Sequence, residues 1–182
     1  MPDYRRCRAA GGTYFFTLVT FRRNSWLCES WARVALRQAI ETTRQRWPFE
    51  IDAWVLLPDH LHCIWTLPEG DDNYQIRWRL IKQRVSRMIG SRLEPPDLPL
   101  SRQKRGERGV WQRRFWEHLI RDESDFARHF DYIHYNPVKH GLCDRPGDWP
   151  WTTFHRFVQQ GKYAMDWGVV KAPVLDDGIG RE

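Results

Sequence analysis

The spacing of apolar residues along the chain alternates between a strand pattern and a helix pattern. Short runs dense in β-branched, aromatic and aliphatic residues occupy residues 14–22, 51–57, 60–67 and 110–119. Because such runs are bounded by polar, Gly or Pro positions, they predict four strands. A Pro-Asp pair separates the second run from the third, so we expect a tight turn there.

Helical spacing fills the segments between these runs. Apolar residues recur every three or four positions over residues 30–47 and 74–93, which predicts two helices. Ser30 is the expected N-cap of the first helix. Residues 94–109 hold several prolines and many charges, so we expect a loop between the second helix and the fourth strand.

A third helix is expected after Asp122, whose side chain suits an N-cap. Phe126, Phe130 and Ile133 follow at helical spacing and should form the buried stripe of this helix. The proline that follows Asn136 disfavours helical geometry at Asn136 itself, so the helix should end near this residue.

The resulting element order, β-α-β-β-α-β-α, predicts an α+β fold. This order suits a ferredoxin-like split β-α-β arrangement with an antiparallel sheet, in which the third helix lies beside the 60–67 strand. A chain of 182 residues is long enough for one domain with a substantial core. We expect this domain to span residues 1–143. Residues 144–182 should form an appended tail that packs through Trp149, Trp151 and Phe154 and is frayed over about its last ten residues.

Two histidines at the start of the third strand are the first candidates for chemistry. Side chains alternate across a strand, so His60 and His62 share one face, whereas Leu61, Cys63 and Trp65 should bury the other. Two imidazoles held on rigid backbone form half of a divalent-metal site. A pair of surface or hydrogen-bonded histidines is the alternative that this pattern leaves open.

Tyr132 and Asn136 form a second candidate pair. Residues four apart share a helix face, so both side chains should lie beside the apolar stripe. The carboxamide oxygen of Asn136 could complete a metal site with the histidines, and Tyr132 could act as a nucleophile. Glu117, on the preceding strand, could also contact the metal. Ordinary half-buried packing is the alternative role for the tyrosine.

The chain carries 29 Lys and Arg residues against 23 Asp and Glu residues, and its net charge is +6. This excess suits a polyanionic partner, although charge runs also occur as solvated faces. Eleven tryptophans could add stacking platforms for single-stranded nucleic acid. The expected DNA contacts are basic residues of the N-terminal arm, the second helix, the following loop and strand, and the end of the third helix: Arg5, Arg6, Arg8, Lys82, Arg84, Arg87, Arg102, Lys104, Arg105, Arg113, Arg114 and Lys139.

Four stretches of the chain together resemble the HUH endonucleases, and among them the single-tyrosine transposases of bacterial insertion sequences. They are residues 12–20, 57–62, 111–118 and 132–142. The chain is most similar to the REP-associated tyrosine transposases, and the resemblance covers about residues 4–157, which is most of its length.

This resemblance implies a metal-dependent enzyme that cleaves and rejoins single-stranded DNA next to hairpin (REP-like) sequences through a 5′-phosphotyrosine intermediate. It implies His60, His62 and Asn136 as ligands of Mg²⁺ or Mn²⁺ and Tyr132 as the attacking residue. Some relatives in the wider superfamily carry Gln at the position of Asn136, and either side chain offers a carbonyl oxygen. Mobile relatives work as dimers that exchange tyrosine helices, but a tail lying on or near the active site favours a monomer here.

Other features narrow the setting of this protein. No Walker-type phosphate loop occurs, so we expect no nucleotide cofactor. No apolar run approaches a membrane span and no signal peptide opens the chain, so we expect a cytoplasmic, nucleoid-associated protein. Two other functions stay open: a non-catalytic, ferredoxin-like nucleic-acid-binding protein, and a metal-dependent phosphodiesterase that uses water.

Overall fold

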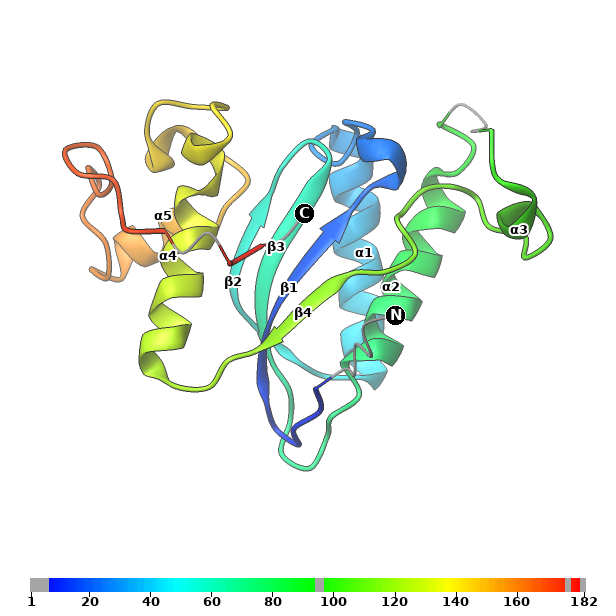
Figure 1. Ribbon diagram of the computed structural model, residues 1–182, viewed down its shortest axis with the longest axis horizontal. Helices are drawn as coiled ribbons and strands as arrows, with labels where there is room; N and C mark the ends of the chain where they lie inside the picture. The colour runs from blue at the N-terminus through cyan, green and yellow to red at the C-terminus, as the bar shows by residue number, and fades with distance from the viewer. Residues whose placement is uncertain (1–6, 94–96, 176–177, 181–182) are drawn as a thin grey trace.

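The computed structural model describes residues 7–93, 97–175 and 178–180, and it shows one sheet with helices on both of its faces (Figure 1). The four strands follow the spatial order β2-β3-β1-β4, and every neighbouring pair is antiparallel. Their bounds are β1 (Thr13–Val19), β2 (Glu50–Leu56), β3 (His60–Thr66) and β4 (Trp116–Leu119).

Helices α1 and α2 cover one face of the sheet and α4 covers the other (Figure 1). The α+β class and the predicted order of the main elements are therefore confirmed. The long helices are α1 (Ser30–Arg46), α2 (Tyr74–Ile89) and α4 (Glu123–Lys139). The short ones are η1 (Phe21–Arg23), α3 (Leu100–Gln103), η2 (Pro146–Asp148) and α5 (Phe154–Gln159). Among the described helices, none is both long and apolar enough to span a bilayer.

The alternation of side chains along β3 divides the interior into two apolar layers. Leu61, Cys63 and Trp65 are fully buried in the layer beneath α1 and α2. Ile64 lies in the opposite layer, where it joins the cluster that contains Tyr132 and other residues of α4. The histidines of β3 therefore share the face that α4 covers, because they have the same parity as Ile64.

Two strand boundaries differ from the sequence prediction. Strand β1 ends at Val19 because the chain then turns: Phe21–Arg23 is a 3-10 turn, with positive φ at Arg22 (53°) and Arg23 (54°). The fourth strand begins at Trp116 rather than near residue 110, since the residues before it form only an isolated bridge, in which Trp111 pairs with Thr20 just after β1.

Helix ends also differ from prediction. Ser30 is the first residue of α1 rather than its cap, since the N-cap position is Glu29. Helix α2 ends at Ile89, earlier than the predicted residue 93, with Gly90 at its C-cap. The cap of α4 is confirmed, because the Asp122 side chain accepts a hydrogen bond from the backbone N–H of Asp125.

Helix α4 was predicted to end near Asn136, and it runs slightly further, through Pro137 to Lys139. A proline within a helix removes one backbone hydrogen bond, here the bond to the carbonyl of Ile133. The last turn is retained because the N–H of His140 donates to the carbonyl of Asn136 at 3.0 Å. Asn136 is thus held in regular helix rather than at a fraying end.

The segment after α4 packs against that helix and against the free edge of β2. Phe154 is fully buried, Trp149 donates its indole N–H to the last carbonyl of β2, and the carbonyl of Trp151 accepts the N–H of the same β2 residue. Ile179 and Gly180 are buried as well. The expectation of a frayed terminus is therefore wrong for these two residues.

Candidate active site

His60 and His62 lie side by side at the start of β3, with ring centroids 5.0 Å apart and exposed fractions of 2% and 0%. The Nδ1 of His60 is 2.6 Å from a carboxylate oxygen of Asp59, and the Nδ1 of His62 shares a hydrogen bond of 2.9 Å with the Thr17 hydroxyl. These bonds orient both rings, so Nε2 is the nitrogen that each ring can offer to a cation.

The Asp59 carboxylate supports this orientation. Burial raises its pKa, but hydrogen bonds and charge from His60 and Arg23 outweigh burial and hold that pKa below the usual value. An ionised carboxylate on Nδ1 increases the basicity of the imidazole. Asp59 therefore acts through His60, in the way that carboxylates commonly assist metal-ligating histidines.

Tyr132 faces these histidines from α4, Asn136 follows one turn later on the same helix face, and both are 0% exposed. The Tyr132 ring lies 5.2 Å from the His62 ring and 6.0 Å from Phe15. Within the described part of the chain, neither the oxygen nor the nitrogen of the Asn136 carboxamide has a hydrogen-bond partner. A buried amide without partners costs about 1–3 kcal/mol, so this side chain is strongly favoured to take up a ligand.

The set of two imidazoles and one carboxamide oxygen fits a divalent cation. Nitrogen and oxygen donors of this kind suit Mn²⁺ and later metals, and carbonyl oxygen also suits Mg²⁺. The structure brings His60, His62, Tyr132 and Asn136 to one face of the sheet, where α4 covers it. The residues chosen from the two distant sequence segments therefore meet.

Lys139, which we expected to contact DNA, lies on the same face of α4 as Tyr132, and its side chain extends back toward the tyrosine. Its ammonium group donates to the Tyr132 hydroxyl at 3.2 Å and lies 4.6 Å from the ring centroid. The Lys139 side chain is otherwise exposed. The ring of the next residue, His140, stands 5.0 Å from that of His60. The end of α4 thus adds a fixed positive charge beside the nucleophile candidate.

The end of the chain covers Tyr132. Ile179 packs in the apolar cluster that contains Tyr132, and Gly180 lies directly against the tyrosine hydroxyl. A methyl group at Gly180, whose φ is +67°, would overlap that hydroxyl. Only glycine therefore fits here without displacing either partner.

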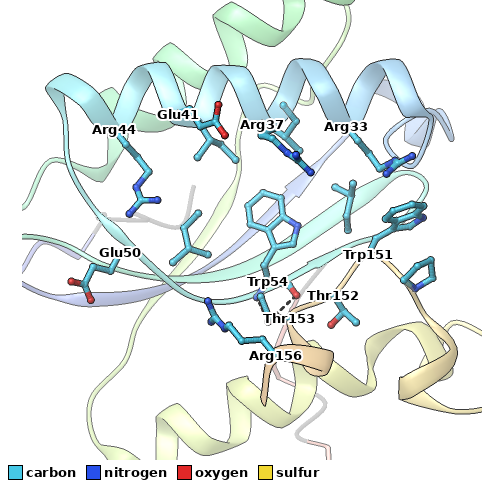
Figure 2. Close-up of a pocket in the computed structure, with 15 residues that line it drawn as sticks. Arg33, Arg37, Glu41, Arg44, Glu50, Trp54, Trp151, Thr152, Thr153 and Arg156 are labelled. Atoms are coloured by element: carbon cyan, nitrogen blue, oxygen red, sulfur yellow. Dashed lines mark hydrogen bonds between the residues drawn. The ribbon is translucent and has the colours of Figure 1, made fainter. Parts of the chain in front are cut away.

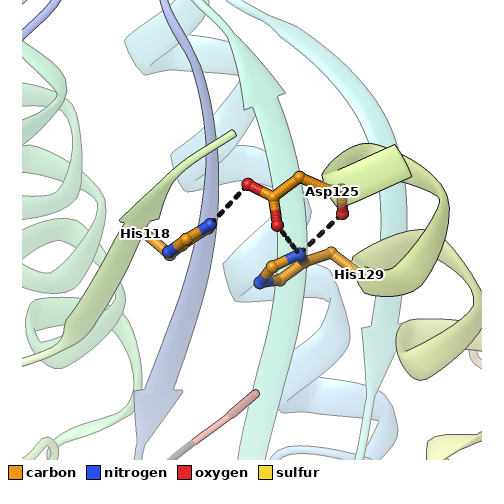
Figure 3. A group of neighbouring side chains, drawn as sticks. All are labelled: His118, Asp125 and His129. Carbon is orange, nitrogen blue, oxygen red and sulfur yellow. Dashed lines mark hydrogen bonds and ion pairs between the residues drawn. The ribbon is translucent and has the colours of Figure 1, made fainter. Parts of the chain in front are cut away.

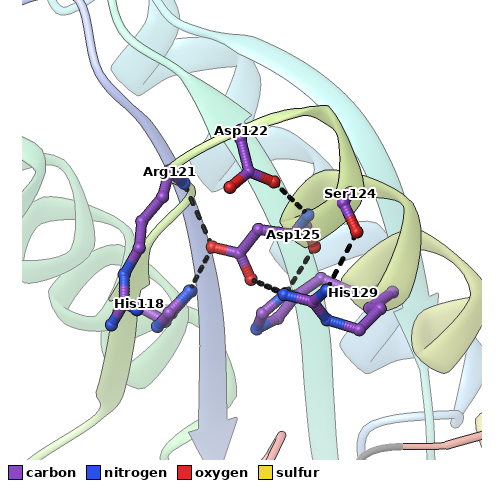
Figure 4. Close-up of polar contacts among 7 residues, drawn as sticks. His118, Arg121, Asp122, Ser124, Asp125 and His129 are labelled. Carbon is purple, nitrogen blue, oxygen red and sulfur yellow. Dashed lines mark hydrogen bonds and ion pairs between the residues drawn. The ribbon is translucent and has the colours of Figure 1, made fainter.

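A second polar cluster joins His118 of β4 to Asp125 and His129 of α4 (Figure 3). One Asp125 carboxylate oxygen lies 2.8 Å from Nε2 of His118, and His129 Nδ1 donates to the Asp125 carbonyl at 2.8 Å. The backbone N–H of Arg121 donates to the same carboxylate (Figure 4). The guanidinium of Arg128 donates to its other oxygen. Burial raises the Asp125 pKa, but the hydrogen bonds from His118 and Arg121 and the charge of the two histidines outweigh burial and lower that pKa.

This cluster has ligand atoms close enough for a metal, all within 4.8 Å of one another. Its carboxylate, however, already accepts several hydrogen bonds, and Arg128 places a permanent positive charge 3.3 Å from it. The imidazole rings are stacked at 4.5 Å, which does not direct them toward one cation. We therefore interpret the cluster as an anchor between β4 and the first turn of α4.

Glu117, considered as a metal contact, lies on the wrong face of the sheet. Glu117 is next to His118 on β4, so the two side chains point to opposite faces of the sheet. Glu117 is buried in the layer with α2 and accepts a hydrogen bond of 3.3 Å from the Tyr74 hydroxyl. The expectation is wrong because the register of β4 against β1 turns this side chain away from α4.

The expected DNA contacts divide into several groups. Arg5 and Arg6 lie outside the described residues. Lys82, Arg87 and Arg113 line a hollow of about 530 Å³ between α2 and residues 106–113. Arg84 lines a different hollow, between α1 and α2. The remaining ones are partly or fully exposed on the α2 side and on the loop before β4: Arg8, which bonds Gln75, Arg102, which lies over Phe21, and Lys104, Arg105 and Arg114.

A second basic surface, on α1, was not predicted from the sequence. Arg33, Arg37 and Arg44 line a groove with Arg156 of α5, on the side of the molecule where β2 forms the sheet edge (Figure 2). The signal was available, because spacings of four and seven place the first three residues on one helical face. It was overlooked because no two of these arginines are adjacent in sequence.

Comparison with known proteins extends the likeness to nearly the whole chain. Residues 10–136 match the family model described as "Transposase IS200 like". A REP-associated tyrosine transposase of Escherichia coli (strain K12) is 46% identical over 167 residues, which cover 92% of this chain and 91% of the relative. A relative of the same designation from Haemophilus influenzae is 46% identical over 168 residues, covering 92% of this chain and 94% of its own length.

The fold is shared as well as the sequence. A solved structure of a REP-associated tyrosine transposase bound to a REP hairpin matches with a TM-score of 0.78 at 44% identity. The match covers 97% of this chain and 94% of the solved one, so it includes the segment after α4. The chain therefore belongs to the IS200-like transposase family, in its branch of REP-associated tyrosine transposases.

Proposed function

We propose that this protein cleaves and rejoins single-stranded DNA next to hairpin, REP-like sequences, with Tyr132 as the nucleophile. The observation that carries the proposal is the placement of Tyr132 and the unpartnered Asn136 on α4, facing the histidine pair of β3. The relatives named above are tyrosine transposases, and the solved one is bound to a REP hairpin. The same substrate class suits the basic surface of this chain.

His60, His62 and Asn136 would hold a divalent cation, and we propose Mg²⁺ or Mn²⁺. When bound, such a cation polarises a scissile phosphate and offsets the charge that develops on it. The imidazole positions are set in advance by Asp59 and Thr17. Little reorganisation is then needed when substrate arrives.

Tyr132 carries the covalent step in this proposal. Its phenolic oxygen forms a bond to phosphorus, the bond from phosphorus to the 3′-oxygen breaks, and the phenolic proton passes to solvent. The departing oxygen takes up a proton and becomes a free 3′-hydroxyl. A 3′-hydroxyl later reverses the step, so the phosphodiester bond is restored without ATP. Lys139, next to the phenolic oxygen, would stabilise its negative charge and the incoming phosphate.

Access to Tyr132 requires the end of the chain to move. Gly180 rests on the hydroxyl that must reach phosphorus, so DNA and residues 178–180 cannot occupy this space together. We therefore propose that residues 144–182 act as a tail on the catalytic unit formed by residues 1–143. A tail that covers the site within one chain is consistent with a monomer.

The proposal is tested by trapping the protein on DNA. Single-stranded oligonucleotides with a hairpin and randomised flanks, labelled at the 3′ end, should become covalently attached to the wild-type protein. Tyr132→Phe should abolish this adduct, because the hydroxyl is lost while the fold is kept. Tyr135→Phe is the matched control: its ring packs near Trp167 and Gly168, away from the histidines, so it should retain the adduct.

The two other functions give different results in the same assay. A phosphodiesterase that uses water would cleave DNA without any adduct, in both tyrosine variants. A non-catalytic binding protein would bind the oligonucleotide but leave it uncleaved. Peptide mapping that finds the nucleotide on Tyr135 would also overturn the assignment of Tyr132.

A further inference from the structure

The groove beside α1 has the shape of an open channel. Its volume is about 780 Å³, and it runs along β2 from Glu50 to Leu56, between α1 and the segment that leads into α5 (Figure 2). Strand β2 forms the edge of the sheet, so no further strand closes this side. The groove therefore offers an extended surface rather than an enclosed cavity.

Positive charge predominates along this groove. Arg37 and Arg44 project from α1 and Arg156 from α5, and all three are exposed, whereas the acidic residues are Glu41 and Glu50 (Figure 2). With Arg33 included, four cations face two anions, and guanidinium groups suit phosphate because their donors are planar and paired. A phosphodiester backbone along the channel would meet these groups in succession.

Two partly exposed tryptophans lie between the arginines. Trp54 stands in the middle of the groove, and Trp151 lies at its Leu56 end beneath the guanidinium of Arg33, 3.6 Å from the ring centroid (Figure 2). Basic groups alternating with aromatic faces are the arrangement that binds single-stranded nucleic acid, because bases stack on the rings while phosphates contact the cations. Closed duplex DNA cannot stack on them in this way.

One end of the groove lies beside the candidate active site. Leu56, at that end, pairs with Leu61, which lies between the two histidines on β3. Trp149, two residues before Trp151, packs in the apolar cluster that contains Tyr132. A strand lying in the groove would therefore leave it close to the nucleophile, on the side opposite the basic surface of α2 and β4.

We propose that this groove binds the single-stranded segment that flanks the hairpin, with its phosphates on Arg37, Arg44 and Arg156 and a base on Trp54. The inference rests on the proposed function in taking DNA as the substrate. It assigns the two basic surfaces to different parts of that substrate: the groove to the unpaired flank and the α2 side to the hairpin.

The test compares single-residue variants of α1 in fluorescence anisotropy. The probes are a labelled thymidine strand of about 20 nucleotides, a length that covers one or two single-strand sites, and a flush hairpin without flanks. Each lost phosphate contact removes roughly 0.7 from the salt slope, which is about a fivefold loss of affinity at 0.1 M salt. Arg37→Gln and Arg44→Gln should each show this loss with the thymidine strand and none with the hairpin.

Arg46→Gln is the matched control, because it removes the same charge from the same helix but lines the hollow on the α2 side. It should leave the binding of the thymidine strand unchanged. All three arginines are exposed, so thermal melting should show folded proteins of similar stability. A strand that carries iodouracil should crosslink under ultraviolet light to a peptide containing Trp54.

Each other outcome overturns the inference. Equal losses with both probes would show that the groove holds the paired hairpin. Unchanged binding of both probes would leave the groove to a partner other than DNA. Both results are independent of the proposed function, because the Tyr132 adduct of the wild-type protein is measured separately and thymidine binding requires no cleavage.

Discussion

Replacing Gly180 by alanine should uncover Tyr132. The added methyl group would overlap the tyrosine hydroxyl, and the φ of +67° at this position is unfavourable for any residue with a side chain. The conformational cost alone is about 1–2 kcal/mol. Because 1.4 kcal/mol corresponds to a factor of ten, residues 178–180 should leave the tyrosine at least about tenfold more often.

The control for this prediction is Gly161→Ala. Gly161 also has a positive φ, +70°, but nothing lies within 4 Å of an added methyl group there. It therefore reproduces the backbone strain without the overlap. Faster reaction of Tyr132 in Gly180→Ala but not in Gly161→Ala would therefore report the position of Gly180 against the tyrosine rather than strain at a glycine in general.

Acetylation of tyrosine hydroxyls by N-acetylimidazole, followed by mass spectrometry, measures exposure without DNA. The Tyr132 peptide should react about tenfold faster in Gly180→Ala than in the wild type, and as in the wild type in Gly161→Ala. Adduct formation on single-stranded DNA should accelerate in parallel. Equal acetylation of Tyr132 in all three proteins would refute the idea that the chain end limits access.

Three further predictions concern the metal, the basic surface and the response to acid. His62→Ala should abolish cleavage but keep most single-strand binding, and EDTA should have the same effect until Mg²⁺ or Mn²⁺ is added; nicking that persists in chelator would contradict a metal role. Arg87→Gln combined with Arg113→Gln should lower the salt slope for the flush hairpin by roughly 1.8, because each lost contact to paired DNA removes about 0.9, and an unchanged slope measured by anisotropy would place the hairpin elsewhere. Burial lowers the pKa of His134 to about 3, so the unfolded state binds the extra proton between pH 6.5 and 3. The stability contributed by neutral His134 is therefore present above pH 6.5 and is lost as the pH falls toward 3, by an amount on the order of 4 kcal/mol. His134→Gln should reduce this acid sensitivity in urea melts at pH 7 and pH 4, and an identical pH dependence in both proteins would show that His134 is not its cause.

The spacing of residues along the chain determined the order of the main elements and which candidate site residues share a face. The alternation of β3 placed His60 and His62 together, and the four-residue spacing on α4 placed Tyr132 with Asn136, because both periods are properties of the backbone. The order of the main elements followed from the same periods. The continuation of α4 through Pro137 was not predicted, because a proline near the end of a helix removes only one hydrogen bond, and packing of the last turn against the sheet compensates for it.

The roles of the arginines were the feature that the sequence predicted least well. Arg77 belongs to the basic run on α2, yet it is 0% exposed and pairs with Asp71 at 2.7 Å. Arg37 and Arg44 are separated along the chain, yet they line one groove. Whether an arginine is a structural ion pair or a ligand contact depends on which element packs over it, and that is decided by contacts distant in sequence.

The arrangement of the active site depends on both the spacing of residues along the chain and the tertiary contacts. Spacing along the chain determined which side chains share a face within β3 and within α4. It did not determine that α4 covers the histidine face, since a helix can pack on either side of a sheet with the same apolar stripe. Nor did it place Gly180 on Tyr132, 48 residues earlier in the chain. Those contacts form only when the helices pack on the two faces of the sheet. The burial of apolar surface that drives this packing depends on which surfaces meet in the folded protein, not on the spacing of residues along the chain.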